Sequence, residues 1–102
     1  MRNKIAIIGS TGSIGKTLLD IISKDEKNFD IKLLTANKDY KTLLNQAKKF
    51  KVKKLIITNK DSYEFLKKKT KSLNIEIFNN FDELDKIFKN KIDYVMSSII
   101  GI

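Results

Sequence analysis

The chain has 102 residues, a formal net charge of +9 and a pI of about 9.7, and 41% of its residues are hydrophobic. This length suits one domain at most, and the balance of apolar and charged residues is that of a globular chain. Cysteine and histidine are both absent from the sequence. Disulfides and thiolate metal sites are therefore excluded, as are the commonest general base and metal ligand. No apolar run approaches the roughly 20 residues of a membrane-spanning helix and no signal peptide is recognisable, so we expect a cytoplasmic protein with no membrane partner.

The positive charge comes almost entirely from lysine, because Arg2 is the only arginine among the 21 basic residues. Lysine, asparagine and isoleucine all have AT-rich codons, so genome composition accounts for the bias without a ligand. Proteins that read bases favour arginine, whose planar fork makes bidentate contacts. The densest basic run is Lys67, Lys68 and Lys69 with Lys71, which we interpret as a solvated helix face. We expect no specific nucleic-acid partner, although a basic, non-enzymatic nucleic-acid-binding module stays an alternative.

Short apolar runs alternate with longer amphipathic stretches, which is typical of βαβ units and a parallel sheet. In chain order the sequence predicts a strand over 4–9, a helix over 13–23, a polar turn over 25–30, a strand over 31–35, a helix over 40–50 and a strand over 54–58. A third helix from Asp61, a short strand over 75–78 near an edge, a fourth helix from Asn80 and a strand over 93–99 follow. The fold class is therefore α/β: an incomplete Rossmann-type parallel sheet of about five strands flanked by helices.

Apolar side chains at helical spacing predict which face of each helix packs on the sheet. They are Ile14, Leu18, Ile21 and Ile22 in the first helix, and Leu43, Leu44, Ala47 and Phe50 in the second. Asp61 and Glu64 have the spacing of a capping box for the third helix, and Asn80 with Glu83 repeats it. The last predicted strand has no following helix to cover it, as an open parallel sheet requires. We therefore interpret the chain as a domain truncated before its end, or as one whose open surface a partner covers.

A glycine-rich turn, with the spacing G-x-x-G-x-x-G over residues 9–15, joins the first predicted strand to the first predicted helix. Gly9 suits the tight turn, Gly12 would let a pyrophosphate approach the backbone, and Gly15 would let the helix pack closely on the sheet. The N–H groups of Gly12, Ser13 and Ile14 are expected to point from the helix N-terminus, where donors and dipole favour an anion. The hydroxyls of Thr11 and Ser13 can add hydrogen bonds. The position of this motif in a βαβαβ pattern predicts a dinucleotide site.

A second interpretation of the same turn is a P-loop, because Gly15, Lys16 and Thr17 match the end of G-x-x-x-x-G-K-[ST]. The first glycine of that pattern would fall at position 10, which is Ser10, and Gly9 comes one residue too early. No later predicted strand ends in the acid that would hold magnesium through water. A P-loop NTPase-like phosphate binder nevertheless stays an alternative.

The end of the second predicted strand bears on the choice between NAD and NADP. NAD-binding proteins place an acid there, whereas this strand runs through Ala36 into Asn37 and Lys38. Lys38 can pair with a 2′-phosphate, and Asn37 can donate to a phosphate or ribose oxygen, which favours NADP. Lys38 could equally be an ordinary surface lysine. Asp39 could cap the next helix or hydrogen-bond the adenosine.

The string from Ile7 to Gly15, followed by residues 17–22, resembles the opening of the 1-deoxy-D-xylulose 5-phosphate reductoisomerases. The resemblance continues through residues 34–39, at a cofactor loop, and returns at residues 95–101. It implies that residues 1–102 are the N-terminal NADPH-binding domain of such an enzyme, truncated before its end, with catalytic and C-terminal domains absent. The family is NADP-dependent and usually homodimeric. It converts 1-deoxy-D-xylulose 5-phosphate into 2-C-methyl-D-erythritol 4-phosphate for isoprenoid biosynthesis.

The resemblance also assigns residues to the cofactor. Thr11, Gly12, Ser13 and Ile14 would hold the NADPH pyrophosphate, and Asn37, Lys38 and Asp39 would surround the adenosine and its 2′-phosphate. Ser98, Ile99 and Gly101 would lie near the nicotinamide.

Two departures stand out. The family often has a small residue in place of Asn37, and it usually has Asn in place of Asp39. An ionised Asp has no donor, so NADPH affinity is expected to be lower than in typical members.

The full-length family also uses Mg²⁺ or Mn²⁺ and a sugar phosphate. This sequence has no counterpart of the residues that bind them, so we expect no catalytic or metal-binding residue and no activity from the chain alone.

Overall fold

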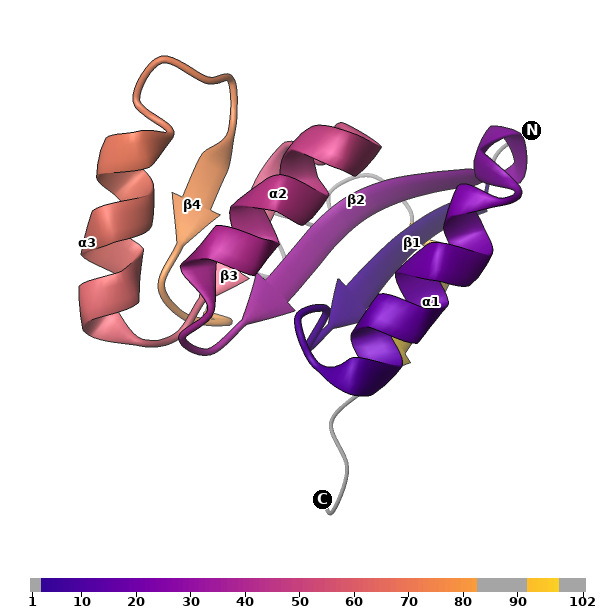
Figure 1. The fold of residues 1–102 in the computed structure, drawn as a ribbon, viewed down its shortest axis with the longest axis horizontal. Helices are drawn as coiled ribbons and strands as arrows, with labels where there is room; N and C mark the ends of the chain where they lie inside the picture. The colour runs from indigo at the N-terminus through magenta and orange to yellow at the C-terminus, as the bar shows by residue number, and fades with distance from the viewer. Residues whose placement is uncertain (1–2, 83–91, 98–102) are drawn as a thin grey trace.

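The computed structural model describes residues 3–82 and 92–97, and these residues form one parallel sheet with helices packed on it (Figure 1). The strand order is β4-β3-β2-β1-β5. The strands are β1 (Asn3–Ile8), β2 (Phe29–Ala36), β3 (Lys54–Ile57), β4 (Glu76–Phe78) and β5 (Tyr94–Ser97). The helices are α1 (Ser13–Ser23), α2 (Tyr40–Phe50) and α3 (Lys60–Lys69), with a 3₁₀ turn, η1 (Glu26–Asn28), before β2. The predicted α/β class and parallel sheet are confirmed.

The path of the chain across the sheet places the helices. From β1 to β4 each strand is added on the same side, and right-handed crossovers then put α1, α2 and α3 on one face. Figure 1 shows α1 and α2 over that face, with α3 beyond α2. The chain then returns to the other side of β1, where β5 pairs with it. Strand order therefore reverses at β1, and in open parallel sheets ligands bind outside the carboxyl ends of strands at such a point.

The core fills both faces of the sheet, as a parallel sheet requires. On one face Ile5 and Ile7 of β1 belong to a cluster that includes Leu19 and Ile22 of α1. On the other face Ala6, Leu33 and Ile56 form a second cluster, against which Phe78 and Ile92 pack. The short apolar runs in the sequence were therefore a sound indication of buried strands.

Several element boundaries differ from the predicted ones. The second strand begins at Phe29 rather than Ile31, because Phe29 and Asp30 pair with Asn3 and Lys4 of β1. Part of the predicted turn over 25–30 therefore belongs to the sheet. The short strand β4 lies at one edge of the described sheet, as predicted. At the predicted start of the fourth helix, the Asn80 Oδ1 accepts a hydrogen bond from the Asp82 backbone N–H at 2.9 Å. The rest of that predicted helix, after residue 82, and the end of the predicted last strand fall outside the described residues.

The predicted inward face of α1 is wrong at two positions. The buried residues are Gly15, Leu19 and Ile22, whereas Ile14 is 42% and Ile21 is 59% exposed. The physical reason is the close contact between Gly15 and the preceding loop, which rotates the helix about its axis. In α2 the prediction holds, because Leu43, Leu44 and Ala47 are buried and Phe50 packs against the core.

The capping box predicted for the third helix is also wrong. The helix begins at Lys60, and Asn59 is its N-cap, whose side chain accepts a hydrogen bond from the Ser62 backbone N–H at 3.0 Å. Asp61 lies in the first turn, where its negative charge interacts favourably with the positive end of the helix dipole. The basic run Lys67, Lys68, Lys69 and Lys71 is exposed, as predicted, although Lys71 lies beyond the end of α3 and so is not part of the predicted helix face. Within the described part of the chain, no helix combines the length and the apolar character needed to cross a membrane.

Candidate functional site

Two of the three motif glycines have a role in the fold itself. Gly9 has φ 77°, in the left-handed region that strains a residue with a side chain. At Gly15, a Cβ atom would lie 2.4 Å from the Gly9 carbonyl oxygen and 2.6 Å from the Ser10 Cα. These are backbone atoms, which cannot move aside as the end of a side chain can. The tight turn and the close packing predicted from the sequence are therefore both present.

Gly12 has no comparable role in packing. It is the N-cap of α1 with φ -77°, which any residue can adopt, and no side chain caps this helix by a hydrogen bond. A Cβ atom at Gly12 would meet only the Gly9 carbonyl oxygen, at an ordinary contact distance of 3.7 Å. Neither backbone strain nor packing within the described residues therefore requires a glycine at this position.

The backbone amides at the start of α1 are partly engaged. The Gly12 N–H, predicted to be a donor for an anion, instead donates to the Gly9 carbonyl at 3.3 Å. The first helical hydrogen bond runs from the Lys16 N–H to the Gly12 carbonyl at 2.9 Å. Among residues 3–82 and 92–97, none accepts a hydrogen bond from the N–H of Ser13 or Ile14. Two of the three predicted donors therefore remain at the positive end of the helix dipole.

The end of β2 holds the glycine-rich loop in place. The Thr35 hydroxyl oxygen accepts a hydrogen bond from the Gly9 N–H at 2.9 Å, and the Thr35 carbonyl accepts one from the Ser10 N–H at 2.9 Å. Asn37, next along the chain, donates its side-chain amide to the Thr58 hydroxyl at 2.6 Å. Three strand ends are thus tied together at the carboxyl edge of the sheet.

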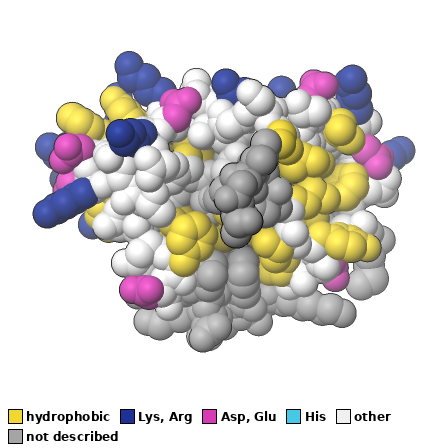
Figure 2. Space-filling model, turned by 90° about the horizontal axis from the view of Figure 1, so that it is seen from below, with side chains coloured by type: hydrophobic (Ala, Val, Ile, Leu, Met, Phe, Trp, Pro, Cys, Tyr) yellow, Lys and Arg dark blue, Asp and Glu magenta, His cyan; other side chains and the backbone are white. Residues whose placement is uncertain are grey.

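A cavity of about 400 Å³ lies at this edge. Its lining residues are Gly9, Thr11, Gly12, Thr35, Ala36, Asn37, Thr58 and Phe81. Of the predicted site residues, the structure therefore brings Thr11, Gly12 and Asn37 around one space. Figure 2 views the molecule from below Figure 1, where β1 and β2 end; yellow hydrophobic side chains are exposed on this face, and the dark blue basic side chains lie mostly toward its margins.

Lys38 and Asp39 are exposed neighbours of this cavity and do not line it. Asp39 caps α2, since its Oδ1 accepts a hydrogen bond from the Thr42 backbone N–H at 3.1 Å. Hydrogen bonds from the side chain and backbone of Thr42 hold the pKa of the Asp39 carboxyl below its ordinary value, and the charges of Lys16 and Lys41 lower it further. Of the two roles considered for Asp39, capping is confirmed, and the side chain is an anion at neutral pH.

Sequence reasoning missed three polar residues that shape the site: Thr35, Thr58 and Gln46. The signal for the two threonines was their place at the carboxyl ends of parallel strands. Gln46 lies on α2, and its amide makes two hydrogen bonds to Ser10. No local pattern marks it, because its partner is 36 residues away.

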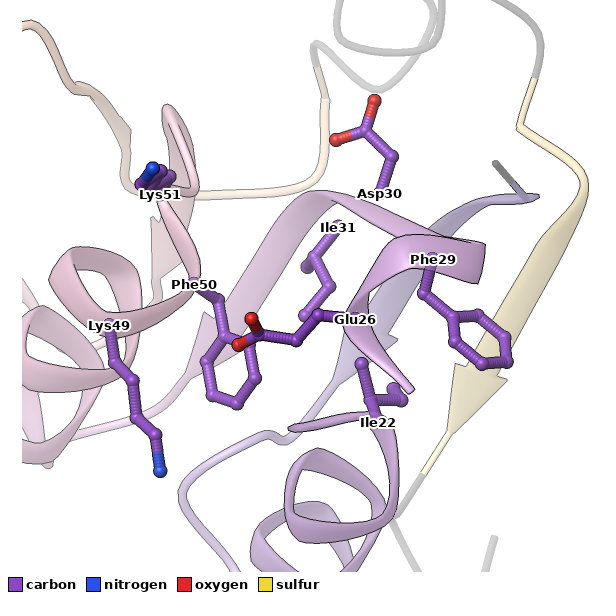
Figure 3. A pocket seen from close by; sticks show the side chains of 8 residues that line it. All are labelled: Ile22, Glu26, Phe29, Asp30, Ile31, Lys49, Phe50 and Lys51. Atoms are coloured by element: carbon purple, nitrogen blue, oxygen red, sulfur yellow. The ribbon is translucent and has the colours of Figure 1, made fainter. Parts of the chain in front are cut away.

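A second, smaller cavity of about 170 Å³ lies where β2 begins (Figure 3). It is lined by Ile22, Glu26, Phe29, Asp30, Ile31, Lys49, Phe50 and Lys51. None of the predicted site residues is among them. No cluster of acidic side chains that could hold a metal ion occurs within residues 3–82 and 92–97. The cavity beside the glycine-rich loop is the candidate site because predicted site residues, Thr11, Gly12 and Asn37, line it.

Comparison with known proteins points to one family. The chain matches the family model of 1-deoxy-D-xylulose 5-phosphate reductoisomerase over residues 5–102. It is 55% identical over 100 residues to the reductoisomerase of Pelagibacter ubique (strain HTCC1062), covering 96% of this chain and 26% of the relative. It is 35% identical to that of Phocaeicola vulgatus, covering 99% of this chain and 27% of the relative. The chain therefore spans about a quarter of the length of these relatives.

Solved structures agree. The reductoisomerase from Zymomonas mobilis in complex with NADPH superposes with a TM-score of 0.86 at 30% identity, over 99% of this chain and 27% of that one. A reductoisomerase in complex with NADPH, fosmidomycin and magnesium gives a TM-score of 0.85 at 30% identity, over 97% of this chain and 25% of that one. The predicted resemblance is confirmed, and neither the P-loop nor the nucleic-acid alternative is favoured. The chain belongs to the 1-deoxy-D-xylulose 5-phosphate reductoisomerase family.

Proposed function

We propose that this chain binds NADPH in the cavity at the carboxyl edge of its sheet. Thr11, Gly12, Ser13 and Ile14 hold the diphosphate, and the tip of β2 holds the adenosine half. The observation that carries the proposal is that Thr11, Gly12 and Asn37 line one and the same cavity. Related solved structures of this fold are complexes with NADPH.

The loop fits a diphosphate on chemical grounds. The N–H groups of Ser13 and Ile14 have no acceptor among the described residues, and they lie at the positive end of α1. The hydroxyls of Thr11 and Ser13 add neutral donors. Because Gly12 has no side chain and the space that a Cβ atom would occupy there is free of close contacts, an anion can reach the backbone. When bound, the dinucleotide supplies a hydride, and the chain's part is to bind and orient it.

The tip of β2 discriminates between the two dinucleotides. Asn37 lines the cavity, and the exposed Lys38 follows it, so its ammonium can reach a 2′-phosphate beside the cavity. No acid occupies the last position of β2, where an NAD-binding protein would hold the ribose hydroxyls. Asp39 contributes through its cap, which fixes the start of α2, but its carboxylate repels a phosphate. We therefore propose a preference for NADPH over NADH with modest affinity.

For the longer protein to which such a chain corresponds, we propose the family's reaction. That reaction rearranges 1-deoxy-D-xylulose 5-phosphate and reduces the product with NADPH to 2-C-methyl-D-erythritol 4-phosphate. The sugar phosphate and Mg²⁺ or Mn²⁺ would be bound by residues outside this chain, which would act as the N-terminal cofactor domain. A cytoplasmic location and a homodimeric assembly through other regions belong to the same proposal. The nicotinamide would lie toward Ser98, Ile99 and Gly101, which are outside the described residues.

Titration with NADPH and NADH, followed by cofactor fluorescence, tests the proposal. The chain is expected to bind NADPH more tightly than NADH, and Lys38→Ala is expected to remove that preference. Lys48→Ala is the matched control, because it deletes the same charge from an exposed position near the other end of α2. Equal affinity for both cofactors in the unsubstituted chain, or a preference that survives Lys38→Ala, would contradict the assignment of Lys38.

A further inference from the structure

Ser10 is a fully buried polar residue in the glycine-rich loop, and each of its polar groups has a partner. Its exposure is 0%, and its N–H donates to the Thr35 carbonyl at 2.9 Å. Its hydroxyl donates to Gln46 Oε1 at 2.8 Å, and its carbonyl accepts from Gln46 Nε2 at 2.8 Å. One amide side chain from α2 therefore holds both the side chain and the backbone of Ser10.

This pair of hydrogen bonds fixes the orientation of a peptide plane. The Ser10 carbonyl and the Thr11 N–H belong to the same planar trans peptide, in which they point in opposite directions. Because Gln46 holds the carbonyl toward α2, the Thr11 N–H points away from α2. Within residues 3–82 and 92–97 no group accepts a hydrogen bond from that N–H, and Thr11 lines the cavity.

We propose that Gln46 is a positioning residue for the dinucleotide site. By holding the Ser10 carbonyl, it presents the Thr11 N–H as a further donor to the diphosphate. The inference rests on the proposed function. An amide is suited to the task because it accepts from the Ser10 hydroxyl and donates to the Ser10 carbonyl at once. A carboxylate could accept but not donate, and an apolar side chain could do neither.

Three variants separate positioning from general stability. Gln46→Leu removes both hydrogen bonds, and Gln46→Glu keeps an acceptor for the Ser10 hydroxyl but loses the donor to the carbonyl. Asn45→Ala is the matched control, since Asn45 is an exposed neighbour on the same helix. Thermal unfolding followed by circular dichroism shows which variants remain folded. If Gln46→Leu unfolds, Gln46→Glu carries the test.

Binding of both cofactors supplies the first readout. NADPH and NADH share the diphosphate, so both Gln46 variants are expected to raise the two dissociation constants by about tenfold, as expected for one mispositioned hydrogen bond. The ratio between the two constants should not change, whereas Lys38→Ala should change it. Asn45→Ala should alter neither constant. Unchanged dissociation constants in folded Gln46 variants, or an altered ratio, would overturn the inference.

The second readout needs no cofactor. In the ligand-free chain the NMR amide resonance of Thr11 is expected to move in Gln46→Glu and Gln46→Leu and to stay in place in Asn45→Ala. If the unsubstituted chain binds neither cofactor, the proposed function fails, and the Thr11 resonance alone then decides whether Gln46 orients this peptide. A Thr11 resonance that stays in place in folded Gln46 variants overturns the inference regardless of binding.

Discussion

Gly12→Ala is expected to weaken NADPH binding strongly while leaving the fold almost unchanged. The added Cβ would meet the chain only at the Gly9 carbonyl oxygen, 3.7 Å away, and the backbone at φ -77° accepts an alanine. Alanine is a poorer N-cap than glycine, which costs about 1 kcal/mol or less. In the proposed site the methyl group would instead occupy space through which the diphosphate is expected to approach the Ser13 and Ile14 amides. Losing one charge-assisted hydrogen bond costs about 1.5–3 kcal/mol, which corresponds to a roughly 10- to 150-fold higher dissociation constant.

Gly15→Ala is the matched comparison, and its effect should be on stability. A helical Gly→Ala change normally gains up to about 1 kcal/mol. Here the Cβ would lie 2.4 Å from the Gly9 carbonyl oxygen and 2.6 Å from the Ser10 Cα, so the loop backbone must shift. Overpacking of this kind costs about 1–3 kcal/mol or more, which outweighs the gain. A melting temperature lower by roughly 4–8 °C per kcal/mol is expected for a domain of this size.

Thermal unfolding by circular dichroism and NADPH titration by fluorescence measure the two effects on the same samples. The expected result is a crossed pattern: Gly12→Ala loses affinity with only a small fall in melting temperature from its poorer N-cap, and Gly15→Ala shows the larger fall in melting temperature. A Gly12→Ala variant that binds NADPH as tightly as the unsubstituted chain would falsify the diphosphate assignment. A Gly15→Ala variant of unchanged stability would contradict the close approach of α1 to the loop.

Four further predictions concern the pH dependence of stability, cofactor affinity, helix capping and activity. In the folded chain the Asp39 carboxyl has a pKa below its ordinary value of 3.8. The stability that this carboxylate adds to the fold is therefore present above about pH 3.8 and is lost as the pH falls through the folded-state pKa. In acid unfolding curves, the difference in stability between the unsubstituted chain and Asp39→Ala should shrink over that range. Asp39→Asn keeps a cap acceptor and removes the negative charge, so it should bind NADPH more tightly in the fluorescence titration, and unchanged or weaker binding would count against the predicted repulsion. Asn59→Ala should lower the free energy of unfolding by about 1 kcal/mol in denaturant unfolding, and Asp61→Ala should lower it by less, because Asn59 is the N-cap of α3. A larger loss for Asp61→Ala would support the capping box that the sequence predicted. The chain alone is expected not to consume NADPH with 1-deoxy-D-xylulose 5-phosphate and a divalent metal, and measurable turnover in an absorbance assay would refute this.

Local pattern was sufficient for most of the fold. The helices α1 and α2 begin and end where the sequence predicts, because the glycine-rich turn before α1 and the apolar spacing and Asp39 cap of α2 act over a few positions. The beginning of β2 at Phe29 was not predictable in this way. Its first two residues are strand because Asn3 and Lys4 offer backbone partners across the sheet. The start of α3 was misjudged because two possible caps, Asn59 and Asp61, lie two residues apart.

The glycine-rich loop and the tip of β2 were predicted as a candidate site from the sequence alone, because glycine turns and strand ends are local signals. The rotation of α1, which exposes Ile14 and Ile21 and buries Gly15, was decided by the contact of Gly15 with the loop backbone. The same holds for Thr35 and Gln46, which hold the loop from 25 and 36 residues away. Spacing along the chain determines which backbone groups can face an anion. Only packing between distant elements determines how they are aimed, because a peptide plane is oriented by the partners that reach it in space.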